Sequence, residues 1–431
     1  MRSKPSVLII GGGVAGLSSA LTHLQAGFRV TLIEKRKQLG GRAWSDAKGL
    51  DNGPHVILGC YHHFRKLLRA LGTEGLFEKE ESLQLTWVFK GGQSLRLRPP
   101  KLPSPLHLLA GLIRLDLPLK ARICLIKGTL SVRLPLPPPG TTLQDWFVKR
   151  KINRDTQSLF FVPLCRAVMN VEADQADARL FLKTLRVAFG ASRKEGAIWC
   201  PTAPWSQILH RAGALFLEKN RVEWVHASVK ALSLSQDKGI DSVTLGNGQK
   251  RSSFDRLVLA VPWEEAAKLA PFADFATKAK EIQSSSIVSV SFPPPRQPFP
   301  FNEPLLALVG GEPFHFLCKA PSPNGWLTLL AGAADHAQIQ TQEAWIEEAL
   351  KCFQTFFGPG KLLPESPHQS CRVRREARAT IASTPRIAGL RPKPGPTEIQ
   401  GLWLAGDWTD TGFPSTLEGA AKSGAFPAYP A

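Results

Sequence analysis

The chain has 431 residues, of which 43% are hydrophobic and 21% are charged, and its formal net charge is +19. This composition excludes a disordered chain and allows two or three domains with sizeable cores. The excess of positive charge favours an anionic partner, either a membrane surface or nucleic acid. Because the sequence carries no zinc-finger or RNA-binding pattern, we expect an anionic membrane surface and no nucleic acid.

Residues 6–34 predict one βαβ unit. The apolar run SVLII (6–10) is typical of a buried strand, LSSALTHLQAG (17–27) has helical spacing, and RVTLIEK (29–35) predicts a second strand. Gly11, Gly13 and Gly16 permit a tight turn, the approach of a pyrophosphate and close helix–strand packing. Glu34 stands where a carboxylate can accept hydrogen bonds from the ribose of an adenosine. The unit therefore predicts dinucleotide binding.

Two further stretches narrow the choice of dinucleotide. GGRAWS (40–45) has glycines that allow close approach, and Arg42 can bind phosphate oxygens. LAGDWTDTGFPSTLEGA (404–420) predicts a buried strand, an acidic turn and the start of a helix. With DNGPHVILGCY (51–61), these stretches resemble the flavoprotein family of amine oxidases and carotenoid-type desaturases.

The resemblance implies non-covalently bound FAD, because no cysteine lies close to 404–420 to tether a flavin. It places Arg42 at the phosphates, Asp407 by the ribityl–phosphate part, and the backbone of Thr416 and Leu417 near the flavin pyrimidine edge. Helix N–H groups aimed at that edge would stabilise the negative charge of a reduced flavin. The other implied FAD contacts are Val14, Ala15, Lys35, Gly41, Gly53, Pro54, His55, Val229 at the adenine, and Gly406.

The same resemblance predicts an α/β fold, with a discontinuous, Rossmann-like FAD-binding domain and a mixed α+β substrate domain. We assign 1–85, 205–265 and 370–431 to the FAD-binding domain, and 86–204 and 266–369 to the substrate domain. FDRLVLAVP (254–262) predicts the strand that returns to the first domain. SSSIVSVSFPPPR (284–296) predicts a strand ended by prolines.

Residues 101–133 are rich in leucine and in basic residues. They predict two short helices hinged at Pro118, with only one acidic residue, Asp116. The basic residues are Lys101, Arg114, Lys120, Arg122, Lys127 and Arg133. A basic amphipathic segment favours contact with an anionic membrane, although a core helix with a solvated basic face is the alternative. We expect a cytoplasmic protein, peripheral on the inner face of the cell membrane, with its seven cysteines reduced.

Four stretches, 51–61, 163–190, 375–392 and 406–424, are similar to the squalene-associated FAD-dependent desaturase group. This resemblance implies the reduction of hydroxysqualene to squalene by hydride from reduced FAD, in squalene and hopanoid biosynthesis. It implies an isoprenoid substrate and upstream squalene-pathway enzymes as partners. The stretch 195–209 diverges from the group, so the geometry of the substrate lining stays open.

Loss of a hydroxyl group requires a proton donor and a dry pocket with electron-rich faces such as Trp44. The catalytic candidates are His55 first, then Asp51 and Asp410. Each has a structural alternative: a turn cap for Asp51, a hydrogen-bonded imidazole for His55 and a helix cap for Asp410. Asn170 is either a polar pocket residue or a helix end, and no metal site is predicted.

Three rival functions share this fold. Amine oxidases carry an aromatic cage where this chain has Thr416, and the chain has only two tyrosines, so an amine substrate is disfavoured. A true desaturase would run the flavin in the oxidising direction on dehydrosqualene or phytoene. A non-catalytic prenyl carrier, like the Rab escort and GDP-dissociation-inhibitor proteins, would not require the intact motif of Gly11, Gly13 and Gly16.

Overall fold

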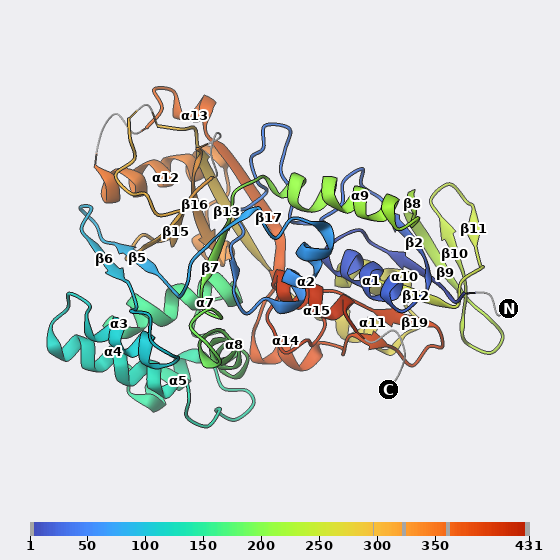
Figure 1. Ribbon diagram of the computed structural model, residues 1–431, viewed down its shortest axis with the longest axis horizontal. Helices are drawn as coiled ribbons and strands as arrows, with labels where there is room; N and C mark the ends of the chain where they lie inside the picture. Colours follow the sequence, from blue (N-terminus) through green and yellow to red (C-terminus); the bar gives the residue numbers. More distant parts are fainter. Residues whose placement is uncertain (1–3, 296, 321–324, 359–362, 427–431) are drawn as a thin grey trace.

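A computed structural model of the chain describes residues 4–295, 297–320, 325–358 and 363–426. Figure 1 shows an elongated molecule with a parallel sheet at one end. A second, largely antiparallel sheet and a group of helices lie at the other end. The predicted α/β class with a mixed α+β second region is confirmed.

The parallel sheet is built around β1, whose five residues are all buried. An unbroken apolar run is what a strand covered on both faces requires. Five strands run parallel in the order β19-β12-β1-β2-β8, and β18 adds an antiparallel edge. The strands are β1 (Ser6–Ile10), β2 (Arg29–Glu34), β8 (Glu223–His226), β12 (Arg256–Leu259), β18 (Gly395–Pro396) and β19 (Leu402–Leu404).

Alternate side chains of β1 enter two different cores. Val7 and Ile9 pack in the core that also contains residues of α1 (Val14–Gln25), α2 (His62–Leu71), α9 (Ala212–Lys219) and α15 (Leu417–Gly424). Leu8 and Ile10 face the opposite core. That core is covered by α10 (Trp263–Leu269), α11 (Asp274–Lys280) and a small sheet of β9 (Val229–Leu234), β10 (Ile240–Leu245) and β11 (Lys250–Arg251).

The second sheet has seven strands in the order β17-β13-β16-β15-β14-β5-β6. They are β5 (Leu85–Val88), β6 (Ser94–Leu97), β13 (Ser284–Phe292), β14 (Leu305–Leu308), β15 (Phe316–Lys319), β16 (Leu327–Gly332) and β17 (Arg372–Ile381). Residues of α12 (Gln342–Phe357) share one core with this sheet. The helices that share the other core are α3 (Leu106–Ile113), α4 (Leu119–Ser131), α5 (Leu143–Arg150), α7 (Val162–Met169) and α8 (Ala178–Gly190).

Short elements complete the chain. A three-stranded sheet joins β3 (Ile57–Leu58), β7 (Ile198–Pro201) and β4 (Phe77–Lys79). Single turns of helix are α6 (Arg154–Thr156), η3 (Ala334–Ala337), α13 (Pro367–Ser370) and α14 (Pro385–Leu390). Two π-helical turns, η1 (Gln157–Phe161) and η2 (Ser206–Arg211), precede α7 and α9.

Two strands cross the domain boundaries drawn from the sequence. β17 lies in the range 370–431 assigned to the FAD-binding domain, yet it pairs with β13 in the seven-stranded sheet. β7 lies in the range 86–204 assigned to the substrate domain, yet it pairs with β3 and β4 from the range 1–85. An alternating strand pattern does not identify its partner strand, which is why ranges drawn from the sequence do not follow these pairings.

The segment 101–133 forms the two predicted helices. α3 ends at Ile113, and Pro118 stands at the N-cap of α4, where its fixed φ suits a helix start. Within the part of the chain that the structure describes, no helix is long and apolar enough to cross a membrane.

Asn170 joins the helical region to the seven-stranded sheet. It ends α7 in a left-handed conformation, with φ of 52°, and its side chain is buried. Its Nδ2 donates to the carbonyl of Ser285 at 3.2 Å and to Oγ1 of Thr380 at 3.0 Å, and its Oδ1 accepts the N–H of Ala333 at 2.7 Å. Of the two roles left open by the sequence, the structure therefore places Asn170 at a helix end.

We expect Asn170→Ala to lower the free energy of unfolding by about 3 kcal/mol, because buried partners lose their bonds and alanine disfavours a positive φ. Asn170→Gly keeps the backbone conformation and isolates the side-chain loss. The exposed Asn247→Ala is the control. Thermal unfolding measures all three, and an Asn170→Ala variant as stable as the control would contradict this role.

Candidate active site

The three glycines that follow β1 have different surroundings. An added Cβ at Gly11 would lie 2.3 Å from the carbonyl oxygen of Ala260, and one at Gly16 would lie 1.8 Å from the carbonyl oxygen of Gly11. At Gly13 the nearest heavy atom would be Cα of Gly41, at 3.8 Å. Gly11 and Gly16 are thus required by chain packing, whereas Gly13 leaves space at the start of α1.

The N-terminus of α1 is free to bind an anion. Gly13 is its N-cap and supplies no side-chain hydrogen bond. Among the described residues, no acceptor is bonded to the backbone N–H groups of Val14, Ala15 or Gly16. Unsatisfied N–H groups and the helix dipole suit a phosphate at this point. The residues therefore fit the pyrophosphate of a dinucleotide.

Glu34 ends β2 beside this helix start. Its Oε2 accepts the N–H of Gly12 at 2.6 Å, and its Oε1 accepts the N–H of Arg36 at 2.8 Å. These bonds fix the orientation of the carboxylate. Each carboxylate oxygen has a second acceptor position, so the group still fits the ribose hydroxyls of an adenosine.

Arg42 and Asp407 bring the two ends of the chain together. Nη2 of Arg42 lies 2.6 Å from Oδ1 of Asp407, and Nη1 donates to the carbonyl of Ala379 at 2.6 Å. Burial alone would lower the pKa of Arg42, but the charge and hydrogen bond of Asp407, together with the charges of Glu376 and Glu264, raise that pKa above its ordinary value. Asp407 follows Gly406, whose φ of 155° few other residues adopt.

The C-terminal end of α15 lies against the start of α1. An added Cβ at Gly424 would be 2.1 Å from the carbonyl oxygen of Ala15, so the two helices touch through their backbones. Thr416 caps α15 by accepting the N–H of Gly419 at 3.1 Å. The carboxylate of Glu418 accepts the N–H groups of His63 and Phe64, and so caps α2.

Other predicted cofactor contacts lie around this arrangement. The backbone of Gly41, with φ of 65°, faces Gly13. Leu417 is the first residue of α15, and Lys35 is exposed just beyond Glu34. Val229 begins β9 and is partly buried in the core beneath the parallel sheet. Gly53 has open space around it, and Pro54 lines a neighbouring pocket.

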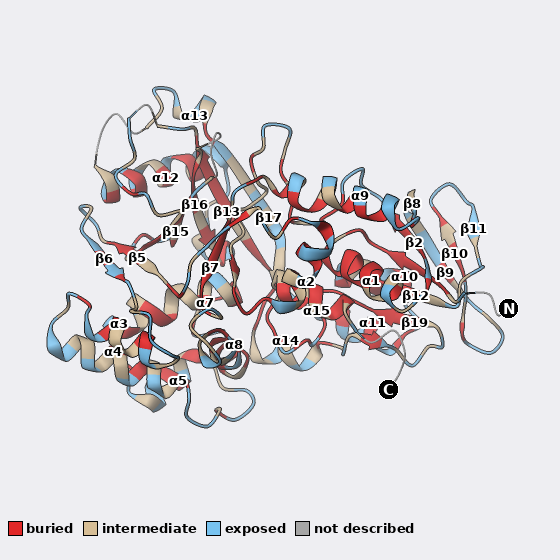
Figure 2. Cartoon of the chain, in the orientation of Figure 1, coloured by how far each residue is buried: buried red, intermediate tan, exposed pale blue. Residues whose placement is uncertain are grey.

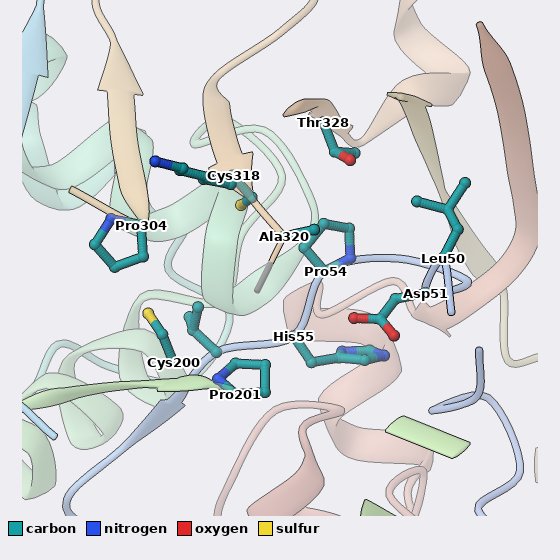
Figure 3. A pocket seen from close by; sticks show the side chains of 12 residues that line it. Leu50, Asp51, Pro54, His55, Cys200, Pro201, Pro304, Cys318, Ala320 and Thr328 are labelled. Carbon is teal, nitrogen blue, oxygen red and sulfur yellow. The ribbon is translucent and has the colours of Figure 1, made fainter. Parts of the chain in front are cut away.

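That pocket lies where the two regions of the molecule meet (Figure 3). One wall is the segment 50–56, and the others come from the end of β7, from β15, from β16 and from Pro304. The lining is mostly apolar. Its polar side chains are those of Asp51, His55, Lys319 and Thr328, with the thiols of Cys200 and Cys318.

Asp51 is held on the pocket wall through one of its two oxygens. Oδ1 accepts the hydroxyl of Ser45 at 2.5 Å and the N–H of Trp205 at 3.3 Å. Oδ2 has no hydrogen-bond partner among the described residues. Burial raises the pKa of Asp51 to about 6, although both hydrogen bonds and Arg374 act in the opposite direction. A carboxyl group with this pKa can carry a proton near neutral pH.

His55 lines the same pocket, with its ring edge-to-face on Trp205 at 5.5 Å between centroids. Burial, followed by the positive charge of Arg42, lowers the pKa of His55 to about 4. The ring is therefore uncharged at neutral pH. This makes Asp51 a better proton donor than His55, which the sequence ranked first.

The structure does not bring Asp410 to the pocket. Its side chain is exposed, and its Oδ1 accepts the N–H of Gly412 at 3.3 Å. The cap of the last helix, its alternative role, belongs to Thr416. Trp44 is likewise absent from the pocket wall, and its ring faces the guanidinium of Arg374 at 5.1 Å.

Sequence reasoning missed the residues that hold Asp51. The N–H of Ser206 donates to Oγ of Ser45 at 3.2 Å, so two consecutive residues, Trp205 and Ser206, brace the pair of Ser45 and Asp51. Ser45 lies in the quoted GGRAWS stretch, and its position six residues before Asp51 was the one feature of the sequence that could have indicated their contact. Nothing in the sequence links Trp205 to Asp51, because their contact spans more than 150 positions.

Comparisons with known proteins agree with this geometry. The family described as flavin containing amine oxidoreductase matches residues 14–428, and the chain belongs to that family. It is therefore a flavin-dependent oxidoreductase. A hydroxysqualene dehydroxylase of Rhodopseudomonas palustris is 29% identical, covering 97% of this chain and 96% of its own length.

Two further relatives are more distant. A chloroplastic or chromoplastic 15-cis-phytoene desaturase of Glycine max is 25% identical, covering 98% of this chain and 78% of its own length. Among solved structures, a putative protoporphyrinogen oxidase from Exiguobacterium has a TM-score of 0.69 at 17% identity. It covers 99% of this chain and 98% of its own, and shows the shared fold.

Gly13→Ala tests the dinucleotide site without disturbing the fold. The added methyl group finds room, with Cα of Gly41 nearest at 3.8 Å, so the melting temperature of the apoprotein should stay unchanged. The same methyl group would stand where the pyrophosphate approaches the backbone, so we expect FAD affinity to fall roughly tenfold or more. Fluorescence titration with FAD measures it, with Gly75→Ala, also in open space, as the control. Equal affinities in both variants would contradict the assignment.

Proposed function

We propose that this protein is an FAD-dependent dehydroxylase that reduces hydroxysqualene to squalene, in the biosynthesis of squalene and hopanoids. The observation that carries the proposal is the mainly apolar pocket beside the dinucleotide site. Asp51 is the one carboxylate among its described lining residues, and its pKa is about 6. The hydroxysqualene dehydroxylase of Rhodopseudomonas palustris, similar over nearly its whole length, supports the same substrate.

FAD fits the site through residues from both ends of the chain. The N–H groups at the start of α1 and the guanidinium of Arg42 would hold the pyrophosphate, and Glu34 would hold the ribose. The first N–H groups of α15 would face the flavin pyrimidine edge. Bound FAD, once reduced, supplies the hydride of the reaction.

Asp51 supplies the proton that the reaction needs. Oδ1 is occupied by Ser45 and Trp205, so the acidic proton resides on Oδ2. As the C–O bond of the allylic alcohol breaks, this proton passes to the departing hydroxyl group, which leaves as water. The hydride takes its place on carbon, and Asp51 regains a proton from solvent. With a pKa of about 6, roughly one molecule in ten holds the proton at pH 7.

The pocket walls keep the reacting carbon dry. Leu50, Pro54, Val56, Pro201 and Pro304 line the pocket together with Asp51 and give it apolar walls. Such surroundings raise the pKa of the acid and protect a carbocation-like carbon from attack by water.

A desaturase acting in the oxidising direction is the second candidate, supported by the similarity to the phytoene desaturase of Glycine max. Desaturation removes hydrogen and needs no proton donor for a leaving group. The protonatable Asp51 therefore favours dehydroxylation. A non-catalytic carrier is disfavoured because it would not need the open N-terminus of α1.

An anaerobic assay tests the proposal. The FAD-loaded protein is reduced, hydroxysqualene is added in detergent, and flavin absorbance and extracted lipid are followed together. Reoxidation of the flavin with formation of squalene is the expected result. If the flavin stays reduced, the proposal fails, and oxidised protein with dehydrosqualene then tests the desaturase alternative.

Asp51→Asn should lower the rate of dehydroxylation about a hundredfold or more, because the amide cannot donate the proton. In the wild type, kcat/KM should fall as pH rises through about 6, because Asp51 loses its proton there. This pH dependence should be absent from the residual activity of the variant. A variant with wild-type rate and pH profile would show that another group is the acid.

Two matched variants separate proton donation from a structural role. The hydroxyl of Ser45 stabilises the ionised form of Asp51, so Ser45→Ala should raise its pKa and move the fall in activity to higher pH. His55→Gln should leave the fall near pH 6, because His55 is already uncharged there. If the fall in activity stays at the same pH in Ser45→Ala but moves in His55→Gln, His55 would be the proton donor.

A further inference from the structure

Exposed apolar side chains gather on one part of the surface. Seven of the thirteen large hydrophobic residues exposed in the described chain lie between positions 102 and 134. They are Leu102, Leu106, Ile113, Leu119, Ile123, Leu130 and Leu134, with exposed fractions of 40–66%. We name these residues, carried by α3, α4 and their flanks, the α3–α4 face. The two helices lie at the lower left of Figure 2, at the end of the molecule away from the parallel sheet.

The same segment carries uncompensated positive charge. Of its basic residues, Lys101 pairs with Glu81 at 3.0 Å. Among the described residues, no carboxylate lies within ion-pair distance of Arg114, Lys120, Lys127 or Arg133. Elsewhere many arginines are paired, as Arg374 is with Asp46 at 2.6 Å. Apolar side chains flanked by unpaired cations are therefore a particular property of this face.

The helices also reach the core that borders the pocket. Leu108 and Leu112 of α3 and Leu125 of α4 are buried in a core that includes Ile198 and Cys200 of β7. Cys200 lines the pocket. The inward sides of α3 and α4 thus hold the fold, so the outward leucines and isoleucines are not needed for it. An exposed apolar surface of this kind marks an interaction site.

We propose that the α3–α4 face docks the protein on the surface of an anionic lipid bilayer. Leucine and isoleucine side chains enter the boundary between headgroups and acyl chains, while the lysines and arginines meet anionic headgroups. The chemistry disfavours a second copy of the chain as the occupant, because two such faces would bring unpaired cations together. Docking deepens the proposed function, because an isoprenoid alcohol dissolves in the bilayer beside this face.

Sedimentation with lipid vesicles tests the docking. Full-length, FAD-loaded protein is mixed with vesicles of phosphatidylcholine, with or without phosphatidylglycerol, in the absence of substrate. We expect binding to the anionic vesicles, weakened by salt. Each cation near an anionic surface contributes roughly fivefold in affinity. The variant Lys120→Gln/Lys127→Gln/Arg133→Gln should therefore bind roughly a hundredfold less.

A second variant, Leu106→Ser/Ile113→Ser/Leu119→Ser, removes apolar contact at unchanged charge and should also lose binding. Leu215→Ser/Lys219→Gln on α9 is the matched control, because Leu215 is 66% exposed and belongs to another region. Its binding should equal that of the wild type. The FAD content and melting temperature of each variant show that it is folded.

Three results would overturn the docking proposal: equal binding to neutral and anionic vesicles, wild-type binding by both face variants, or a dimer in solution that the face variants dissociate. The activity assay in detergent tests the proposed function independently of docking on a bilayer. Activity in detergent without vesicle binding would refute docking alone. Vesicle binding without turnover of hydroxysqualene would refute the dehydroxylase alone.

Discussion

The backbone contact between α1 and α15 is the constraint on which the site depends. At Gly424 there is no room for a side chain, and the hydroxyl of Ser18 donates to the carbonyl of Ala421 at 2.7 Å. The contact places the first and last helices of the chain side by side (Figure 1). Both helices pack in the same core on one side of the parallel sheet, and the pair of Arg42 and Asp407 joins the segment after β2 to the loop that precedes α15. A cofactor with an anion at its centre and a polar ring at one end can then be bound from both ends of the sequence.

The second sheet supplies the opposite walls of the pocket that lies beside this site. The segment 50–56 leaves the dinucleotide region and becomes the wall that faces β15 and β16. Burial raises the pKa of Asp51, and the hydrogen bond from the hydroxyl of Ser45 limits this rise. A carboxyl group poised between these opposing effects suits reversible proton transfer. Burial also lowers the pKa of His55, so this ring is uncharged at neutral pH, whereas Asp51 can exchange a proton near pH 6.

Local patterns in the sequence predicted the parts of the molecule that local physics determines. The apolar run of β1, the spacing of Gly11, Gly13 and Gly16, and the hinge at Pro118 each describe a few adjacent residues, and the structure places them as expected. Arg42 and Asp407 were assigned to one cofactor only through family resemblance. Interactions between residues far apart in the chain could not be predicted from the sequence. Examples are the sheet that β17 joins and the hydrogen bond from Trp205 to Asp51. The exposure of Asp410 was not predicted either. The pattern of a strand does not identify the strand it pairs with, and a single carboxylate in the sequence does not identify its hydrogen-bond partners. Those partners determine the pairing of the strand and the pKa of the carboxyl group.

The central claim is that this pocket replaces a hydroxyl group with a hydride, using a flavin held by both chain ends. It is tested most directly by isotope transfer in a single anaerobic turnover. Protein reduced in D₂O is mixed with hydroxysqualene, and the squalene is analysed by mass spectrometry and NMR. The account predicts one deuterium on the carbon that lost its hydroxyl, because the exchangeable hydrogen of the reduced flavin is the one transferred. Squalene without deuterium at that carbon, or no squalene at all, would contradict it.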